Sequence, residues 1–110
     1  MSNNYEVIFN IILHAGNANS KYLLAIEEAR MYRFQEASLN FDEAEKELHL
    51  AHKIQTDMVQ DEARGKKVEL SLLLVHAQDH LTMATTSRVQ AEEFIHLYKL
   101  ICGLQEEKII

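Results

Sequence analysis

Two histidines, an amide and a carboxylate lie in one short stretch, directly after the aliphatic run 70–75. They are His76, Gln78, Asp79 and His80. On a helix, His76, Asp79 and His80 are three or four positions apart, so they share one face. That face continues an apolar stripe, and buried ionisable groups are costly unless they are paired, ligated or used in chemistry. This stretch is therefore the first place to look for a functional site.

Imidazole is the most reactive group in the stretch, because it is largely a neutral nucleophile near pH 7. If a hydrogen bond holds one ring nitrogen of His76, the other nitrogen keeps its lone pair for attack. The amide NH₂ of Gln78 can stabilise an anion nearby. A core histidine that is hydrogen-bonded to a neighbour is the structural alternative for His76.

A metal site is a further alternative, because His76 and His80 have the i, i+4 spacing of metal ligands. Zinc would need a third or fourth ligand from elsewhere. The remaining histidines, which sit in no recognisable ligand motif, are His14, His49, His52 and His96. A di-iron bundle needs two Glu-x-x-His motifs, and the sequence has one, at 93–96. Asp79 could pair with His80 or a lysine, or bind a cation together with its symmetry mates.

The composition predicts a single all-α domain over residues 1–110. The chain has no proline, three glycines and 47% hydrophobic residues, which is typical of helix-forming sequences. A formal net charge of −6 argues against nucleic acid as the main partner. No apolar run approaches the roughly 20 residues of a membrane span, and the first residues do not resemble a signal peptide. Cys102 is the single cysteine, so a reducing, cytoplasmic location is expected.

Hydrophobic spacing predicts three long helices, at about 4–31, 34–62 and 68–105. Asn3 and Glu6 form a plausible capping pair for the first helix. The charged stretch around Gly65 marks the clearest break, before the third helix. Residues 31–33 carry no strong stop signal, so one long helix through this point remains an alternative.

Each predicted helix has a stripe of mostly apolar positions, largely at three- and four-residue steps, that is expected to be its packed side. On the first they are Ile8, Ile11, Ile12, Ala15, Ala18, Tyr22, Ala25, Ile26 and Ala29; on the second Phe34, Ala37, Phe41, Ala44, Leu48, Ala51, Gln55 and Met58; on the third Leu73, His76, His80, Met83, Ser87, Gln90, Phe94, Leu97, Ile101 and Leu104. Three such rods share a thin core, and the apolar surface that is left over predicts self-association.

Four sequence blocks carry a family resemblance. They are His14-Ala15-Gly16-Asn17-Ala18, Ala51-His52-Lys53-Ile54-Gln55-Thr56, Glu62-Ala63-Arg64-Gly65 and Leu72-Leu73-Leu74-Val75-His76-Ala77-Gln78-Asp79-His80-Leu81. Over about residues 5–104 the chain resembles the IIA component of the lactose/cellobiose-type phosphoenolpyruvate:sugar phosphotransferase system (PTS). The His-Ala-Gln-Asp-His-Leu block is highly specific, and the Ala-His-x-x-Gln-Thr block supports it independently.

The resemblance implies an up-down-up bundle of three antiparallel helices, similar to a spectrin repeat, that assembles as a homotrimer. It implies that His76 accepts a phosphoryl group from the carrier protein HPr and passes it to a cysteine of a IIB component during sugar uptake. Gln78 matches a position that helps to hold the phosphate. Asp79 matches a carboxylate that, one from each chain, surrounds a Mg²⁺-like divalent cation on the threefold axis. His80 matches a family histidine whose role is supporting or structural.

Three positions depart from the family pattern. Asn19 stands where the family usually has arginine, Tyr32-Arg33 where its turn usually carries glycine, and Thr82-Met83 where it usually has Met-Thr. Ala77, where the lactose branch tends to have glycine, favours the cellobiose/chitobiose branch. The sugar itself is read by the membrane component and is not set by this sequence.

The leading hypothesis is therefore a cytoplasmic phosphocarrier for disaccharide uptake, with cellobiose, chitobiose or lactose as the sugar. One alternative is a regulatory helical module whose binding depends on its phosphorylation state. Another is a metal-binding helical bundle without phosphotransfer. Transfer of phosphate to a IIB protein would separate the first two hypotheses, and metal analysis of an Asp79→Leu variant would test the third.

Overall fold

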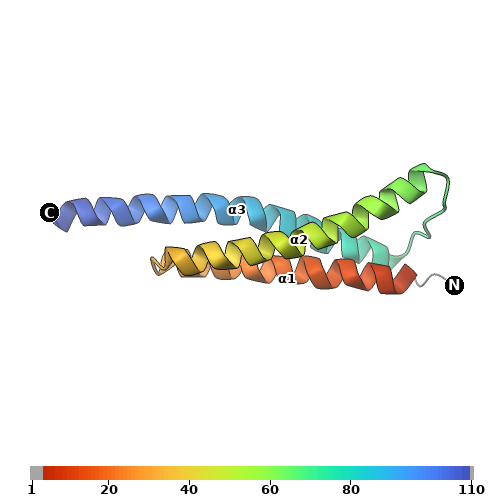
Figure 1. Cartoon of the computed structure of the whole chain (residues 1–110), viewed down its shortest axis with the longest axis horizontal. Helices are drawn as coiled ribbons and strands as arrows, with labels where there is room; N and C mark the ends of the chain where they lie inside the picture. The colour runs from red at the N-terminus through yellow and green to blue at the C-terminus, as the bar shows by residue number, and fades with distance from the viewer. Residues whose placement is uncertain (1–3, 110) are drawn as a thin grey trace.

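The computed structural model describes residues 4–109, which form three antiparallel helices and no strand (Figure 1). Helix α1 spans Asn4–Arg30, α2 spans Phe34–Ala63 and α3 spans Leu72–Ile109. The predicted all-α, up-down-up architecture is confirmed. The bundle is a rod of 66 × 20 × 20 Å, and the last turns of α3 project beyond the α1–α2 turn. Asn3, half of the predicted capping pair, lies outside the described residues.

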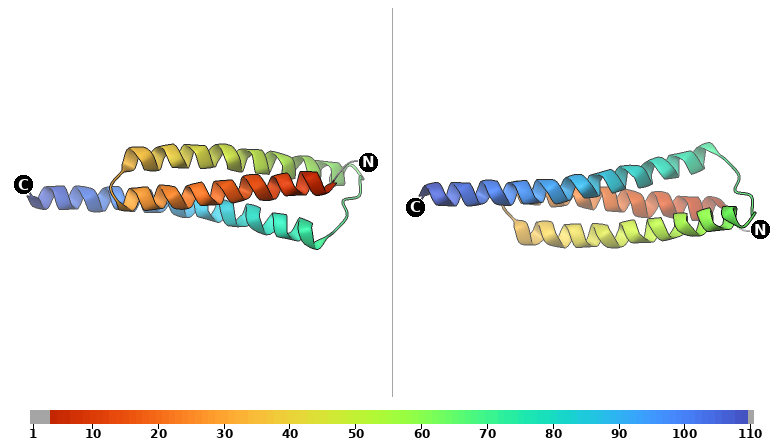
Figure 2. Two further views of the ribbon diagram at one scale, coloured as in Figure 1. Left: turned by 90° about the horizontal axis from the view of Figure 1, so that it is seen from below. Right: turned by 90° about the horizontal axis from the view of Figure 1, so that it is seen from above.

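Helix α1 is the central element. It packs along both other helices, whereas α2 and α3 meet each other over far fewer residues (Figure 2). The predicted positions on α1 and α2 are all buried or half-buried, so the prediction of these two faces is confirmed. Alanines dominate the contact, and their small side chains let the helix backbones approach closely. Fully buried positions are Ile11, Ala15, Ala18, Tyr22, Ala25, Ala29, Ala37, Ala44 and Ala51.

The predicted core stripe of α3 is wrong for the single chain. The face that packs inward instead carries Leu81 and four small residues, namely Ala77, Ala84, Ser87 and Ala91. Of the predicted stripe only Ser87 is buried, while Met83, Phe94 and Leu97 are 53%, 42% and 47% exposed. Helix α3 thus has two apolar faces, and the face with small side chains is the one that fits closely against α1.

The start of α3 also differs from the prediction, which placed it at about Val68. The helix begins at Leu72, because the hydroxyl of Ser71 accepts a hydrogen bond from the backbone N–H of Leu74 at 3.1 Å. This is the geometry of an N-cap serine, which satisfies one of the free N–H groups of the first turn. Residues 66–71 form an irregular connection. At its other end α3 continues to Ile109, beyond the predicted 105.

A tight turn separates α1 from α2, so the alternative of one continuous helix is wrong. The backbone N–H of Arg33 donates to the carbonyl of Glu28 at 2.9 Å, and that of Tyr32 donates to Ala29 at 2.9 Å. These are the two bonds of a Schellman motif. Tyr32 takes the left-handed conformation, with φ of 61°, that the motif requires and that glycine usually supplies. Its hydroxyl donates to Gln105 of α3 at 2.7 Å.

Helix α2 ends in the same way, with glycine at the left-handed position. The N–H of Gly65 donates to Glu62 and that of Lys66 donates to Asp61, each at 3.0 Å. Gly65 has φ of 94°, a conformation that side chains with a Cβ rarely adopt. The prediction from sequence that the helical pattern breaks around Gly65 is confirmed.

A polar cluster joins all three helices. Glu45 of α2 accepts hydrogen bonds from the hydroxyl of Tyr22 on α1 at 2.5 Å and from Nε of Arg88 on α3 at 2.7 Å. The Tyr22 side chain is fully buried. Burial, reinforced by the hydrogen bond to Glu45 and by its negative charge, raises the pKa of Tyr22 well above its usual value. The Arg88 guanidinium also lies 6.0 Å from the ring centre of Phe41.

Replacing Gly65 by alanine is expected to lower the free energy of unfolding by about 1 kcal/mol. A Cβ at this position meets no atom within 4 Å, so the cost comes from backbone strain alone. Gly103→Ala is the matched control, because it lies inside α3 and also meets nothing within 4 Å. Urea titration should show the control equal to or more stable than the wild type. Equal stability of Gly65→Ala and the wild type would show that alanine is not strained in the left-handed conformation at this position.

Replacing Glu45 by alanine is expected to lower the free energy of unfolding by about 2 kcal/mol, mainly because the buried hydroxyl of Tyr22 loses its acceptor. Glu43→Ala is the control, since its partner Lys21 lies on an exposed surface, where ion pairs contribute little. Thermal unfolding followed by circular dichroism compares the two variants. If both lost the same stability, the three-helix cluster would have no special role.

Candidate active site

The outer face of α3 carries the predicted site, within the first three turns of the helix. His76 and Asp79 are exposed and His80 is half-buried. The prediction that these three residues share a face is therefore confirmed. The premise that this face lies in the core of the chain is not, because the inward face of α3 is the one that carries Ala77 and Leu81.

The two histidines contact each other directly. Their Nε2 atoms are 3.1 Å apart, and the rings meet edge to face with centroids 4.5 Å apart and an interplanar angle of 86°. A hydrogen bond at this distance needs one N–H and one lone pair, so one ring donates and the other accepts. The tautomers of the two rings are therefore linked: Nε2 of His76 either carries the proton and donates it, or accepts the Nε2–H of His80. In the tautomer that donates to His80, the lone pair of the other His76 nitrogen is free.

Gln78 lies on a different side of α3. Residues two positions apart on an α-helix are separated by about 160° around its axis, so Gln78 points away from His76. Its amide oxygen accepts a hydrogen bond from Nε2 of Gln55 on α2 at 2.5 Å. That bond joins α2 to α3 near the site. The predicted role of Gln78 in holding phosphate stays a prediction.

Asp79 lies on the outer surface beside His76. Both residues line an open hollow of about 560 Å³ whose other walls are Leu72, Leu73 and Val75. No group of three His, Cys, Asp or Glu residues in the described part of the chain is arranged to hold a metal ion. Carboxylate oxygen is the ligand that Mg²⁺ prefers, so Asp79 suits such an ion chemically, but one chain supplies only one such ligand.

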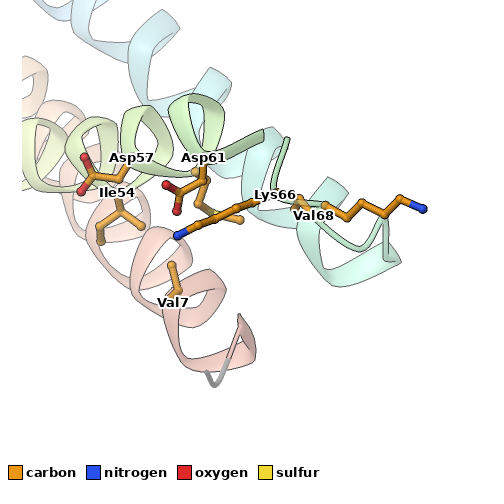
Figure 3. A pocket seen from close by; sticks show the side chains of 8 residues that line it. Val7, Ile54, Asp57, Asp61, Lys66 and Val68 are labelled. Atoms are coloured by element: carbon orange, nitrogen blue, oxygen red, sulfur yellow. The ribbon is translucent and has the colours of Figure 1, made fainter. Parts of the chain in front are cut away.

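A second pocket, of about 510 Å³, lies at the end of the bundle where the 66–71 connection leaves α2 (Figure 3). Its residues come from α1, α2 and the connection; they are Val7, Ile54, Asp57, Met58, Asp61, Lys66, Lys67 and Val68. In Figure 3, Lys66, Asp61 and Val7 surround the opening. Sequence reasoning missed this pocket, because no motif connects residues so far apart in the chain.

Comparison with known proteins assigns the family. The family model described as "PTS system, Lactose/Cellobiose specific IIA subunit" matches residues 6–99. The chain belongs to this family. Within it, the chain is 46% identical over 96 residues to the lichenan-specific phosphotransferase enzyme IIA component of Bacillus subtilis (strain 168), with 87% of each chain covered. In the described part of this PTS IIA chain, no helix is long and apolar enough to cross a membrane.

Solved structures of PTS IIA proteins share the fold. The cellobiose-specific enzyme IIA from Bacillus anthracis superposes with a TM-score of 0.90 at 41% identity, covering 94% of both chains. The IIA(Chitobiose)–HPr complex of the Escherichia coli phosphotransferase system matches with a TM-score of 0.78 at 31% identity, covering 92% of this chain and 98% of that one.

Asn19, one of the predicted departures from the family pattern, has a structural role. It accepts a hydrogen bond from the hydroxyl of Ser87. This bond joins α1 to α3 on the buried side of α3. Position 19 therefore contributes to the packing of the bundle in this chain.

The contact between the two histidines predicts a tautomer preference at His76. Replacing His80 by leucine removes the hydrogen-bonding partner of His76. The proportion of the two tautomers of the His76 ring should then change. Ring ¹⁵N chemical shifts measured by NMR report the protonated nitrogen. His96→Leu, on an exposed part of the same helix, should leave the His76 shifts unchanged. Identical His76 shifts in the wild type and His80→Leu would rule out the contact.

Proposed function

We propose that this PTS IIA chain is a cytoplasmic phosphocarrier that accepts a phosphoryl group from HPr on His76 and passes it to a cysteine of a IIB component. The observation that carries the proposal is the exposed imidazole of His76, held through one nitrogen by His80 at 3.1 Å. An exposed acceptor suits a reaction in which both the donor and the recipient are proteins. The structural relative from E. coli is itself in complex with HPr.

The chemistry exchanges one nitrogen–phosphorus bond for another. A neutral nitrogen of His76 attacks the phosphorus in line, the bond to the HPr histidine breaks, and that imidazole leaves with the electron pair. Transfer to IIB repeats the displacement, with the cysteine thiolate as the nucleophile. Little covalent chemistry is left for the protein, so catalysis consists mostly of positioning and charge stabilisation. His80 acts as a positioning residue, because its hydrogen bond fixes the ring of His76.

A homotrimer around α3 would complete the site. The exposed stripe of large apolar side chains runs along the same face as Asp79 and includes Met83, Phe94, Leu97 and Leu104. Exposed apolar stripes of this kind mark contact surfaces. If three α3 helices pack through this face, three Asp79 carboxylates converge. They repel each other unless a divalent cation with oxygen ligands, such as Mg²⁺, lies between them.

The same packing would give Gln78 its predicted role. His76 and Gln78 lie on opposite flanks of the stripe, with Asp79 between them. Around a threefold axis, the Gln78 flank of one chain faces the His76 flank of its neighbour. The amide NH₂ of Gln78 would then stabilise a phosphate on His76 of the neighbouring chain. Within its own chain Gln78 points away from His76.

The proposed sugar is a disaccharide of the cellobiose/chitobiose class. Curated relatives include the lichenan-specific component already described, and a cellobiose-specific component of Lactococcus lactis is 39% identical over 89 residues. Ala77 also favours the cellobiose/chitobiose class, because the lactose branch tends to have glycine at this position. The sugar would be recognised by the membrane component, so this part of the proposal concerns the system that the chain serves.

Phosphoryl acceptance is tested by incubating the chain with labelled phosphoenolpyruvate, Enzyme I and HPr. An acid-labile, base-stable phosphate is expected on the wild type and on the control His96→Ala, and none on His76→Ala. Adding a cognate IIB protein should then discharge the label. An unlabelled wild type, or a His76→Ala variant that is labelled as strongly as the wild type, would refute the proposal. Label that no IIB protein can discharge would favour the regulatory module.

A further inference from the structure

We propose that His76 and His80 form a binding site for a nitrogen-preferring transition-metal ion, with Zn²⁺ as the test case. Such an ion would compete with the phosphoryl group for His76, and this second part rests on the function proposed above. The site differs from the proposed Mg²⁺ position in its ligands, which are ring nitrogens of a single chain. Imidazole suits zinc, copper and nickel, whereas magnesium takes oxygen ligands.

The spacing of the two nitrogens fits the ion. Zinc–nitrogen bonds of about 2.0–2.1 Å at tetrahedral angles place two ligands roughly 3.3 Å apart. The Nε2 atoms of His76 and His80 are 3.1 Å apart, so their separation is already close to that of two zinc ligands, and both rings must turn to direct their lone pairs at the ion. Because both histidines lie on successive turns of one long helix, their Cα positions are fixed before the ion arrives. Little conformational entropy is therefore lost when the ion binds, which favours affinity.

The surroundings of the pair also suit a cation. Asp79 lies on the same face, is exposed, and adds a negative charge beside His76. No lysine or arginine occurs along α3 from its start until Arg88, so this part of the helix presents no positive side chain that would repel the ion. Since no third His, Cys, Asp or Glu completes a metal cluster among the described residues, water would fill the remaining coordination positions.

Binding would replace the hydrogen bond between the rings. The ring that donates through Nε2 moves its proton to Nδ1, so that both Nε2 lone pairs point at the ion. Each ring keeps one proton, and the net protonation of the pair is unchanged. The metal then binds the Nε2 lone pair of His76. It fixes the His76 ring, as the hydrogen bond to His80 did before. An incoming phosphoryl group would meet a ligated imidazole rather than a free nucleophile.

Calorimetric titration of the full chain with Zn²⁺ tests the site, in a buffer that does not bind zinc and with excess Mg²⁺ to fill any oxygen site. One ion per chain is expected for the wild type. His80→Gln should weaken binding on the order of 100-fold, because the second ligand no longer acts within the same chelate. His52→Gln is the matched control on α2, where His49 and His52 are three positions apart, and it should bind as the wild type does. Zinc binding that His80→Gln leaves unchanged would overturn the site.

The competition is tested separately, with purified phospho-HPr as the donor. At a zinc concentration about ten times the dissociation constant, mass action predicts about tenfold slower labelling of the wild type. The rate of His80→Gln, compared with its own zinc-free rate, should not change. Wild-type labelling that zinc does not slow would overturn the competition. Zinc binding by a chain that never accepts phosphate would support the metal site while refuting the proposed phosphocarrier.

Discussion

The hydrogen bonds that Glu45 accepts from Tyr22 and Arg88 fix how α3 is rotated about its own axis. Helices α2 and α3 share few other contacts, so α3 depends on α1 and on this cluster for its orientation. The inner face of α3 carries mostly alanines, with Leu81 as a larger side chain among them, so packing shape gives only part of the rotation. A rotation of α3 by one residue, about 100°, would turn its outer face to the side, towards the other helices. Together with the bond between Ser87 and Asn19, the buried Tyr22 and the charge on Glu45 therefore favour the rotation that leaves the histidine face of α3 in solvent.

That rotation leaves two kinds of group on the outer face. One is the chemistry of His76, Asp79 and His80 near the start of α3, and the other is the stripe of large apolar side chains farther along. In a single chain this arrangement is costly, because apolar area stays in contact with water. An assembly through the stripe would recover that energy and would leave the histidine pair at its edge, within reach of a partner protein. In the proposed account, assembly and phosphotransfer thus depend on the same face.

The first two helices could be predicted from the sequence, because each has one apolar face with regular three- and four-residue steps. Helix α3 could not be oriented in this way. Its large side chains, such as Met83 and Phe94, form the stronger pattern, yet the small face around Ala77 and Ala84 is the one that packs. Pattern alone does not distinguish a core within a chain from a contact between chains.

The candidate site, too, could be predicted from the sequence only in part. That His76, Asp79 and His80 share a face follows from helical spacing, and the sequence motif identified the family. The contact between the two rings and the bond from Gln55 to Gln78 depend on rotamers and on tertiary packing, which spacing does not determine. The Ser71 cap was missed because the apolar residues before it, such as Val68 and Leu70, continue the apparent helical pattern.

Light scattering with size-exclusion chromatography decides whether the outer face of α3 is an assembly surface. The chain has a mass of 12.7 kDa, and the wild type should elute with three times that mass. Leu97→Glu, which places a charge within the stripe, should elute as a single chain with its helix content retained. A wild type that is monomeric at all concentrations, or a Leu97→Glu variant that remains a trimer, would contradict the account.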